Sequence, residues 1–178
     1  MSGREQGFAP VYGENSRVLI LGSFPSVKSR ACGFYYGNPQ NRFWRTVCGF
    51  FGEQIPATVE GKREFLLRRG IALWDVVTSC EIEGSADSSI RGEERADLLR
   101  LAEACGAPVI LCNGSKAYGT VEKYFPALLP RARKLSSTSP ANPRFSEEAW
   151  FRALGRIFPS FAQNREELSQ KALTSAKK

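Results

Sequence analysis

The chain has 178 residues, a net charge of +7 at neutral pH and a hydrophobic fraction of 42%, which fits a single globular domain with a sizeable core. It contains no histidine and five irregularly spaced cysteines. Ser-His and Cys-His nucleophile pairs are therefore excluded, and no metal site is expected. No apolar run approaches the roughly 20 residues of a membrane span, and the N-terminus lacks the apolar core of a signal peptide. The sequence predicts a cytoplasmic protein whose basic charge favours a polyanionic partner.

The expected elements alternate between apolar strands and amphipathic helices. Strands are expected at 18–21, 71–77, 108–112 and 129–135, and helices at 40–51, 58–70, 93–105, 117–125, 146–158 and 162–178. Residues 1–16 are expected to run over the surface with Phe8 and Tyr12 against the body, and residues 81–92 to form a polar loop. This alternation predicts an α/β protein with a central, mainly parallel sheet. We expect one domain over 1–178, with its core at about 17–158 and a polar helical tail at 162–178.

Three loops rich in glycine, serine, asparagine and proline follow expected strands, at 22–44, 113–117 and 136–144. Each one could be a plain connection. However, the carboxyl ends of parallel strands share one edge of a sheet, and ligands bind at that edge. Three such loops at equivalent positions favour a common site.

The residue types in these loops suit a base attached to a phosphate backbone. Tyr35 and Tyr36 offer ring faces for stacking, and Asn41 and Asn113 offer donors and acceptors for a Watson–Crick edge. Helix N-termini, serine hydroxyls and nearby cations suit phosphates. The cations around the loops are Lys28, Arg30, Arg42, Lys116, Arg131, Arg133 and Arg144. Asp75 interrupts an apolar strand, as either a satisfied structural group or a polar residue that faces a ligand.

The order of the motifs is specific. G-S-F-P-S at 22–26, G-F-Y-Y at 33–36, N-P-Q-N-R-F-W at 38–44, L-W-D at 73–75, N-G-S-K-A at 113–117 and S-T-S-P-A-N at 137–142 together resemble the uracil-DNA glycosylase superfamily. More narrowly, they resemble its hypoxanthine-DNA glycosylase branch. The resemblance covers about residues 17–155. It implies a three-layer α/β/α sandwich with a central four-stranded parallel sheet. It also implies an enzyme that flips a damaged base from DNA and hydrolyses the N-glycosidic bond without a cofactor or a metal.

The residue types in the loops and the resemblance together give expected roles for individual residues. Asn41 is the expected catalytic residue. The expected base-binding residues are Gly22, Ser23, Phe24, Pro25, Tyr36 and Asn113. The expected DNA-binding residues are Lys28, Lys116, Ser137, Thr138, Ser139, Pro140, Ala141, Asn142 and Arg144, with 140–143 as the wedge that enters the duplex.

Three positions depart from the patterns of these relatives. Phe24 stands where mismatch-specific relatives have their catalytic asparagine, Asn38 stands where the branch usually has histidine, and Ser26 where it usually has glycine. Hypoxanthine is the expected base, with xanthine second. Uracil excision, and a nucleic-acid-binding module without chemistry, stay open as alternatives. We expect a monomer that binds damaged DNA.

Overall fold

The computed structural model describes residues 3–175, and its centre is a four-stranded parallel sheet. The strand order is β3 (Ile71–Asp75), β2 (Val18–Gly22), β6 (Val109–Asn113) and β7 (Ala132–Leu135). All five residues of β2 are buried, because helices cover both faces of this central strand. The parallel four-stranded sheet confirms the expected fold class.

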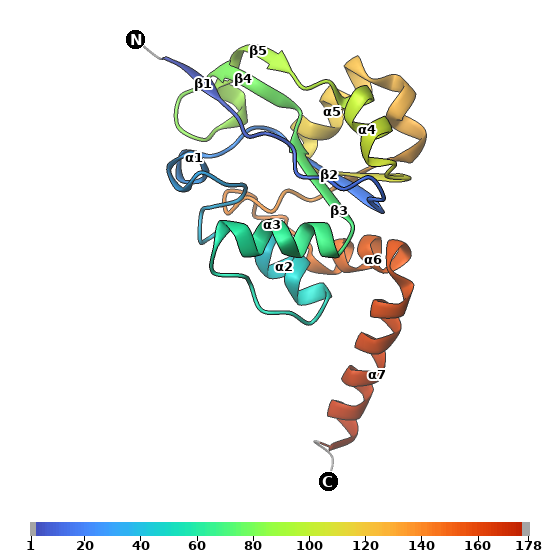
Figure 1. Cartoon of the computed structure of the whole chain (residues 1–178). Coiled ribbons are helices and arrows are strands. Elements are labelled where there is room, and N and C mark those ends of the chain that lie inside the picture. Colours follow the sequence, from blue (N-terminus) through green and yellow to red (C-terminus); the bar gives the residue numbers. More distant parts are fainter. Residues whose placement is uncertain (1–2, 176–178) are drawn as a thin grey trace.

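Helices form a layer on each side of the sheet (Figure 1). One hydrophobic cluster joins Ile20 of the sheet to α2 (Phe43–Phe50), α3 (Val59–Arg68) and α6 (Glu147–Ile157). The other cluster joins Leu19 and Leu21 to α4 (Leu98–Cys105) and α5 (Ser115–Tyr124). Alternate residues of one strand therefore feed the two cores, as the period of a strand requires.

A second sheet was not expected from the sequence. It is antiparallel, with the order β1 (Arg4–Gln6), β4 (Val77–Glu81) and β5 (Arg91–Arg95). The chain passes from β3 into β4 through Val76, whose N–H donates to the Gly22 carbonyl at 2.9 Å. The expected strand 71–77 therefore splits between two sheets, and part of the expected lead-in and of the polar loop forms strands.

Several helix boundaries also differ from expectation. The helix expected at 93–105 begins at Leu98, because the Asp97 side chain caps it by accepting from the Arg100 N–H at 3.1 Å. A short helix, α1 (Val27–Cys32), lies inside the loop expected at 22–44, with Ser26 as its N-cap. Short 3-10 helices, η1 (Asp87–Ser89) and η2 (Pro126–Arg131), precede β5 and β7.

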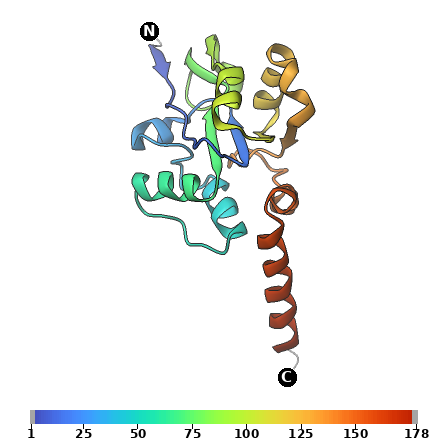
Figure 2. The ribbon, with the colours of Figure 1, turned by 45° about the vertical axis from the view of Figure 1, so that its right-hand side comes forward.

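The two ends of the chain are arranged differently. Near the N-terminus, Val11 is buried and exchanges backbone hydrogen bonds with Leu73, and Phe8 packs against the core as expected. The expectation for Tyr12 was wrong, since 42% of it is exposed. At the other end, α7 (Pro159–Ser175) begins directly after α6 and projects from the body (Figure 2). Within residues 3–175, no helix is both long and apolar enough to cross a membrane.

Candidate functional site

The candidate site lies at the carboxyl edge of the parallel sheet. β2 ends at Gly22, β3 at Asp75 and β6 at Asn113, and Gly22 is paired in register with Asp75. The loops that follow β2, β6 and β7 start from this edge, as the sequence predicted. Open parallel sheets bind their ligands here.

The Asn113 side chain, 8% exposed, joins two of these loops. Its Nδ2 donates to Tyr36 Oη at 3.1 Å and to Thr138 Oγ1 at 2.9 Å, while its Oδ1 accepts from the Thr138 N–H at 2.9 Å. Both amide hydrogens are used inside the protein. Asn113 therefore fixes Thr138 and Tyr36, and it can turn to a Watson–Crick edge only by breaking these bonds.

Tyr36 combines a strained backbone with a stacked ring. Its φ of 53° lies in the left-handed region, which bulky residues rarely adopt. The ring stacks on Phe43 with centroids 4.0 Å apart and an interplanar angle of 20°. Burial, followed by the nearby charge of Asp75, raises the pKa of the phenol, so the hydroxyl stays neutral. One face of the expected stacking platform is thus covered by Phe43, and its hydroxyl is bonded to Asn113.

Asn41 lies two residues before the start of α2, and Arg42 between them is the N-cap of this helix. Its Oδ1 accepts from the Phe43 N–H at 2.9 Å, and its own N–H donates to the Asn38 carbonyl at 2.8 Å. These bonds orient the carboxamide at the N-terminus of the helix. The next residue, Arg42, donates its backbone N–H to the Thr138 carbonyl at 3.0 Å. The expected catalytic residue is therefore connected to the loop after β7.

The Arg42 guanidinium strengthens this connection. It donates to the Asn142 carbonyl at 3.1 Å and to the Pro140 carbonyl at 3.4 Å, and it lies 4.8 Å from the centre of the Phe145 ring. We had expected Arg42 among the cations that face a phosphate backbone. Instead, it stabilises the loop that carries Pro140 and Asn142.

The loop at 137–144 also stabilises itself. Ser137 Oγ accepts from the Ser139 N–H at 3.2 Å, and Ser139 Oγ accepts from the Ala141 N–H at 3.3 Å. Asn142 donates through Nδ2 to the Ser137 carbonyl at 2.9 Å and accepts from the Arg144 N–H at 3.0 Å. Pro140 and Ala141 are exposed at its tip. The loop is thus preorganised, with an exposed small-residue tip.

Gly22 is required at the end of β2. A Cβ atom at this position would lie 2.2 Å from Asp75 Oδ1 and 2.9 Å from Tyr36 Oη. Only glycine leaves room for both groups. Asp75 is 4% exposed, and its Oδ2 has no hydrogen-bond partner among the described residues. Burial and the charge of Asp87 raise the pKa of Asp75 to about 8.

A second carboxyl group, that of Asp87, is bonded to the loop after β2. Asp87 accepts from Ser23 Oγ at 2.7 Å, so it ties η1 to the loop after β2. Desolvation raises the pKa of Asp87, whereas Ser23 and Lys116 lower it. Lys116 forms an ion pair with Glu93. The charge that was expected to face phosphate is therefore partly neutralised by β5.

The remaining expected residues lie around this centre. Phe24 and Pro25 are buried, and the Phe24 ring lies 5.6 Å from the Arg30 guanidinium. Lys28 and Arg144 are exposed and available to solvent. Arg131 donates to the Ala107 carbonyl at 3.0 Å, just before β6 begins. It lies at the opposite edge of the sheet, so its expected place beside the site was wrong.

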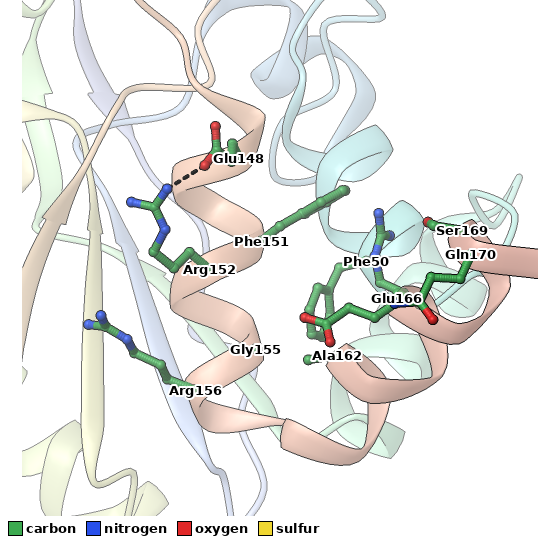
Figure 3. A pocket seen from close by; sticks show the side chains of 11 residues that line it. Phe50, Glu148, Phe151, Arg152, Gly155, Arg156, Ala162, Glu166, Ser169 and Gln170 are labelled. Carbon is green, nitrogen blue, oxygen red and sulfur yellow. Dashed lines mark hydrogen bonds and ion pairs between the residues drawn. The ribbon is translucent and has the colours of Figure 1, made fainter. Parts of the chain in front are cut away.

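Two surface hollows lie elsewhere. A groove of about 630 Å³ runs between α6 and α7, where Phe50 and Phe151 form the apolar wall and a Glu148–Arg152 pair lies at one end (Figure 3). A smaller one of about 290 Å³ adjoins Arg17 and Gly70. Neither includes a residue of the strand-end site. Over residues 3–175, no group of three or more His, Cys, Asp or Glu side chains is placed to hold a metal ion.

Comparison with known proteins assigns the chain to a family. A sequence profile of the Uracil DNA glycosylase superfamily matches residues 9–168, a range that contains every site residue described above. The chain belongs to the Uracil DNA glycosylase superfamily. The resemblance that the motifs indicated is confirmed, and the chain is a DNA glycosylase.

Relatives in this superfamily are similar over most of their length. A hypoxanthine DNA glycosylase of Methanosarcina acetivorans is 41% identical over 145 residues, which cover 80% of this chain and 91% of that protein. One of Methanosarcina barkeri is 37% identical over 143 residues, covering 79% and 90%. A solution NMR structure of a Methanosarcina acetivorans protein, described as a candidate uracil DNA glycosylase, has a TM-score of 0.75 and 39% identity over 87% of this chain and 99% of its own.

Sequence reasoning missed three features of the candidate site. The loop-holding role of Arg42 and the Ser23–Asp87 bond join residues far apart in the chain, and no local pattern marks them. The use of both Asn113 amide hydrogens in bonds within the protein was missed for the same reason. Asp75 did give a signal, since a carboxylate inside an apolar strand needs an explanation.

Proposed function

We propose that this DNA glycosylase removes hypoxanthine from DNA by hydrolysis, with xanthine as a second base. The two curated relatives at 37–41% identity carry the name hypoxanthine DNA glycosylase, which supports this choice of base. The observation that carries the proposal is the connection of Asn41 through Arg42 to the loop at 137–144. A water-orienting carboxamide and a duplex-facing loop are thereby held as one unit.

In this account, water adds at C1′ of the sugar as the C1′–N9 bond breaks. The oxygen of water forms the new bond to C1′. One hydrogen of the water remains on the new sugar hydroxyl, and the other is transferred as a proton to the released base. Asn41 Oδ1 has a second lone pair besides the one directed at Phe43 N–H. It accepts from the attacking water and orients it, and a preorganised contact of this kind requires no reorganisation during reaction.

The backbone N–H groups of the 22–25 loop, other than at Pro25, are assigned to the departing base, together with Ser23 and Phe24 as pocket walls. Tyr36 lies beside the base with its hydroxyl held by Asn113. The segment 140–143 enters the duplex and fills the position that the extruded nucleotide has left. Lys28 and Arg144 contact phosphates of the DNA backbone. Phosphate contacts set position, and pocket contacts set base identity.

The test is direct. The protein is incubated with duplexes that contain one inosine, xanthine or uracil, and abasic sites are then cleaved with alkali. We expect base release to be fastest from the inosine duplex. Faster release from uracil would favour the uracil alternative, and duplex binding without release of any base would reduce the protein to a binding module. We also propose that the protein acts as a monomer in the cytoplasm, and gel filtration with and without DNA checks its oligomeric state.

A further inference from the structure

One carboxyl group in the site has hydrogen-bonding capacity that the protein does not use. Asp75 is 4% exposed at the end of β3, and its Oδ2 is buried without a hydrogen-bond partner among residues 3–175. Buried polar atoms in native proteins are nearly always paired, so an unpaired one needs an explanation. A ligand that supplies the missing partner is such an explanation.

The surrounding chain keeps this carboxyl at the strand-end site. Asp75 Oδ1 occupies the space beside Gly22 that a side chain would need, and Tyr36 Oη borders the same space. Gly22 opens the loop whose next residue, Ser23, binds Asp87. The carboxyl therefore lies beside Gly22 and Tyr36, which belong to two segments that the proposed function assigns to the flipped base.

The other polar candidates for reading a base are already occupied. Asn113 uses both amide hydrogens and its oxygen on Tyr36 and Thr138. Asn41 Oδ1 accepts from the N-terminus of α2 and is assigned to water. Among the site residues described above, Asp75 has the buried side-chain atom, Oδ2, that lacks any hydrogen-bond partner within residues 3–175.

We propose that the Asp75 carboxyl group reads the extruded base by pairing with its lactam edge. A lactam edge is the ring N–H beside a carbonyl that deamination of adenine or cytosine creates. This inference rests on the proposed function. It assigns to Asp75 the base-reading role that the sequence had suggested for Asn113.

The protonation state of Asp75 determines whether this pairing works. A neutral carboxyl group has one O–H donor and one carbonyl acceptor, which match the carbonyl and the N–H of a lactam. An ionised carboxylate has acceptors only, so one oxygen would face the lactam oxygen unfavourably. Burial and the charge of Asp87 raise the pKa of Asp75 to about 8. The neutral, pairing form is therefore present below about pH 8 and is lost as pH rises through that value.

The other titratable groups near Asp75 are consistent with this assignment. Tyr35 and Tyr36, from the loop after α1, both have a raised pKa because of burial and the nearby Asp75, so they stay neutral. Asp87, from η1, is the acidic neighbour, and Lys116 of α5 acts on Asp87. In addition, the O–H of Asp75 faces the oxygen that gains negative charge as the base departs, and this hydrogen bond strengthens in the transition state. The proton stays on Asp75 throughout.

The first experiment compares hypoxanthine with unsubstituted purine, which lacks both the 6-oxygen and the N–H. Single-turnover release of each base is measured for the parent, Asp75→Asn and Asp75→Leu. Asp75→Asn keeps one donor and one acceptor, whereas Asp75→Leu keeps only the volume. The hypoxanthine-to-purine rate ratio is expected to fall about 100-fold in Asp75→Leu and to stay within tenfold of the parent in Asp75→Asn. An unchanged ratio in Asp75→Leu would overturn the inference.

The second experiment covers the case in which Asp75→Leu does not fold. The parent rate for hypoxanthine is measured from pH 6 to 9.5 and should decline about tenfold per pH unit above about 8. The release rate of Asp75→Asn is measured over the same pH range. It should not decline near pH 8, and should fall only where the N–H of the base itself ionises at higher pH. Asp87→Asn serves as the control and should move the decline to lower pH without removing it.

Identical pH profiles for the parent and Asp75→Asn would overturn the inference. A parent rate that rises through pH 8 would do the same, since it would make Asp75 an anionic participant. A parent that releases no hypoxanthine at any pH would instead contradict the proposed function, so the two failures can be distinguished.

Discussion

Asn113 and Thr138 are joined by two hydrogen bonds of 2.9 Å, one to the backbone N–H of Thr138 and one to its hydroxyl. Thr138 is fully buried. This pairing fixes the loop after β7 to the end of β6, and through Arg42 it also fixes the start of α2. The geometry of the whole site therefore depends on contacts between segments about 25 to 100 residues apart.

We expect Thr138→Val to reduce both stability and activity. The Asn113 Nδ2 loses a buried partner, which costs about 1–3 kcal/mol in the free energy of unfolding, and release of hypoxanthine slows because the loop loosens. Urea unfolding and single-turnover assays measure the two effects. Thr120→Val is the matched control. This buried threonine bonds the Lys116 carbonyl within α5, so its loss should leave base release nearly unchanged. A Thr138→Val variant as stable and active as the parent would show that the pairing is incidental.

Arg42→Gln should impair action on duplex DNA more than on single strands. Its guanidinium holds the carbonyls of Pro140 and Asn142, and the proposed wedge is needed only where a base must be pushed from a duplex. We expect the duplex-to-single-strand rate ratio for inosine substrates to fall by about tenfold or more, the cost of roughly 1.4 kcal/mol in the transition state. Arg45→Gln, an exposed position in the first turn of α2, should leave the ratio unchanged. Equal losses on both substrates would place Arg42 outside the wedge function.

Tyr36→Phe is not expected to be silent, which revises what stacking alone predicts from the sequence. The hydroxyl accepts from Asn113 Nδ2 at 3.1 Å, so its removal leaves a buried donor with one partner fewer and costs about 1 kcal/mol. Tyr36→Ala should lose this bond and also roughly 1–3 kcal/mol of stacking. Thermal unfolding measures the loss of the hydrogen bond, and binding to a duplex with a non-cleavable inosine analogue measures the loss of stacking. The exposed Tyr12→Phe serves as the control. A Tyr36→Phe variant identical to the parent would remove the hydroxyl from the account.

Salt dependence distinguishes free cations from paired ones. Arg144 and Lys28 are exposed at the site face, and Arg144→Ala or Lys28→Ala should each lower the log–log salt slope of duplex binding by about 0.9. Lys116→Ala should lower it less, because Lys116 is paired with Glu93. Arg156 lies beside Ile157, whose carbonyl binds Arg17 at the opposite edge of the sheet, so Arg156→Ala should not change the slope. A full reduction in slope for Arg156→Ala would mean that the DNA-binding face is misassigned.

The sequence predicted those parts of the structure that local pattern determines. β2 was recognisable because a continuous apolar run fits a strand buried on both faces, and the glycine- and serine-rich segments after β2, β6 and β7 do meet at one edge. The sequence predicts loop and helix where β5 lies, because four of the five residues in Arg91–Arg95 are charged, and almost all of them are exposed in the structure. No apolar periodicity marks such a strand. β4 pairs it in an antiparallel sheet whose register includes irregularities, and only tertiary pairing reveals this.

The site was predictable in composition but not in connectivity. The type and order of residues predict Asn41, Tyr36 and Asn113 as members of the candidate site. The sequence does not predict which partner each of these residues contacts. For example, Asn113 could face either a base or Thr138 until the fold was known. The unpaired state of Asp75 likewise depends on what surrounds it in space rather than in sequence.

The most direct test of the account is single-turnover release of hypoxanthine by Asn41→Ala and Asn41→Asp. Both variants lose the amide nitrogen, but the aspartate keeps an oxygen that can still accept from the Phe43 N–H as Asn41 Oδ1 does. The account predicts that Asn41→Ala slows release by about 100-fold or more while duplex affinity stays within a few-fold of the parent. Asn41→Asp should fold like the parent and lose less of the rate than Asn41→Ala, because a carboxylate oxygen can still accept from the attacking water. If Asn41→Ala keeps more than about a tenth of the parental rate, its side chain contributes less than about 1.4 kcal/mol to the transition state, and the proposed catalytic role of Asn41 is contradicted.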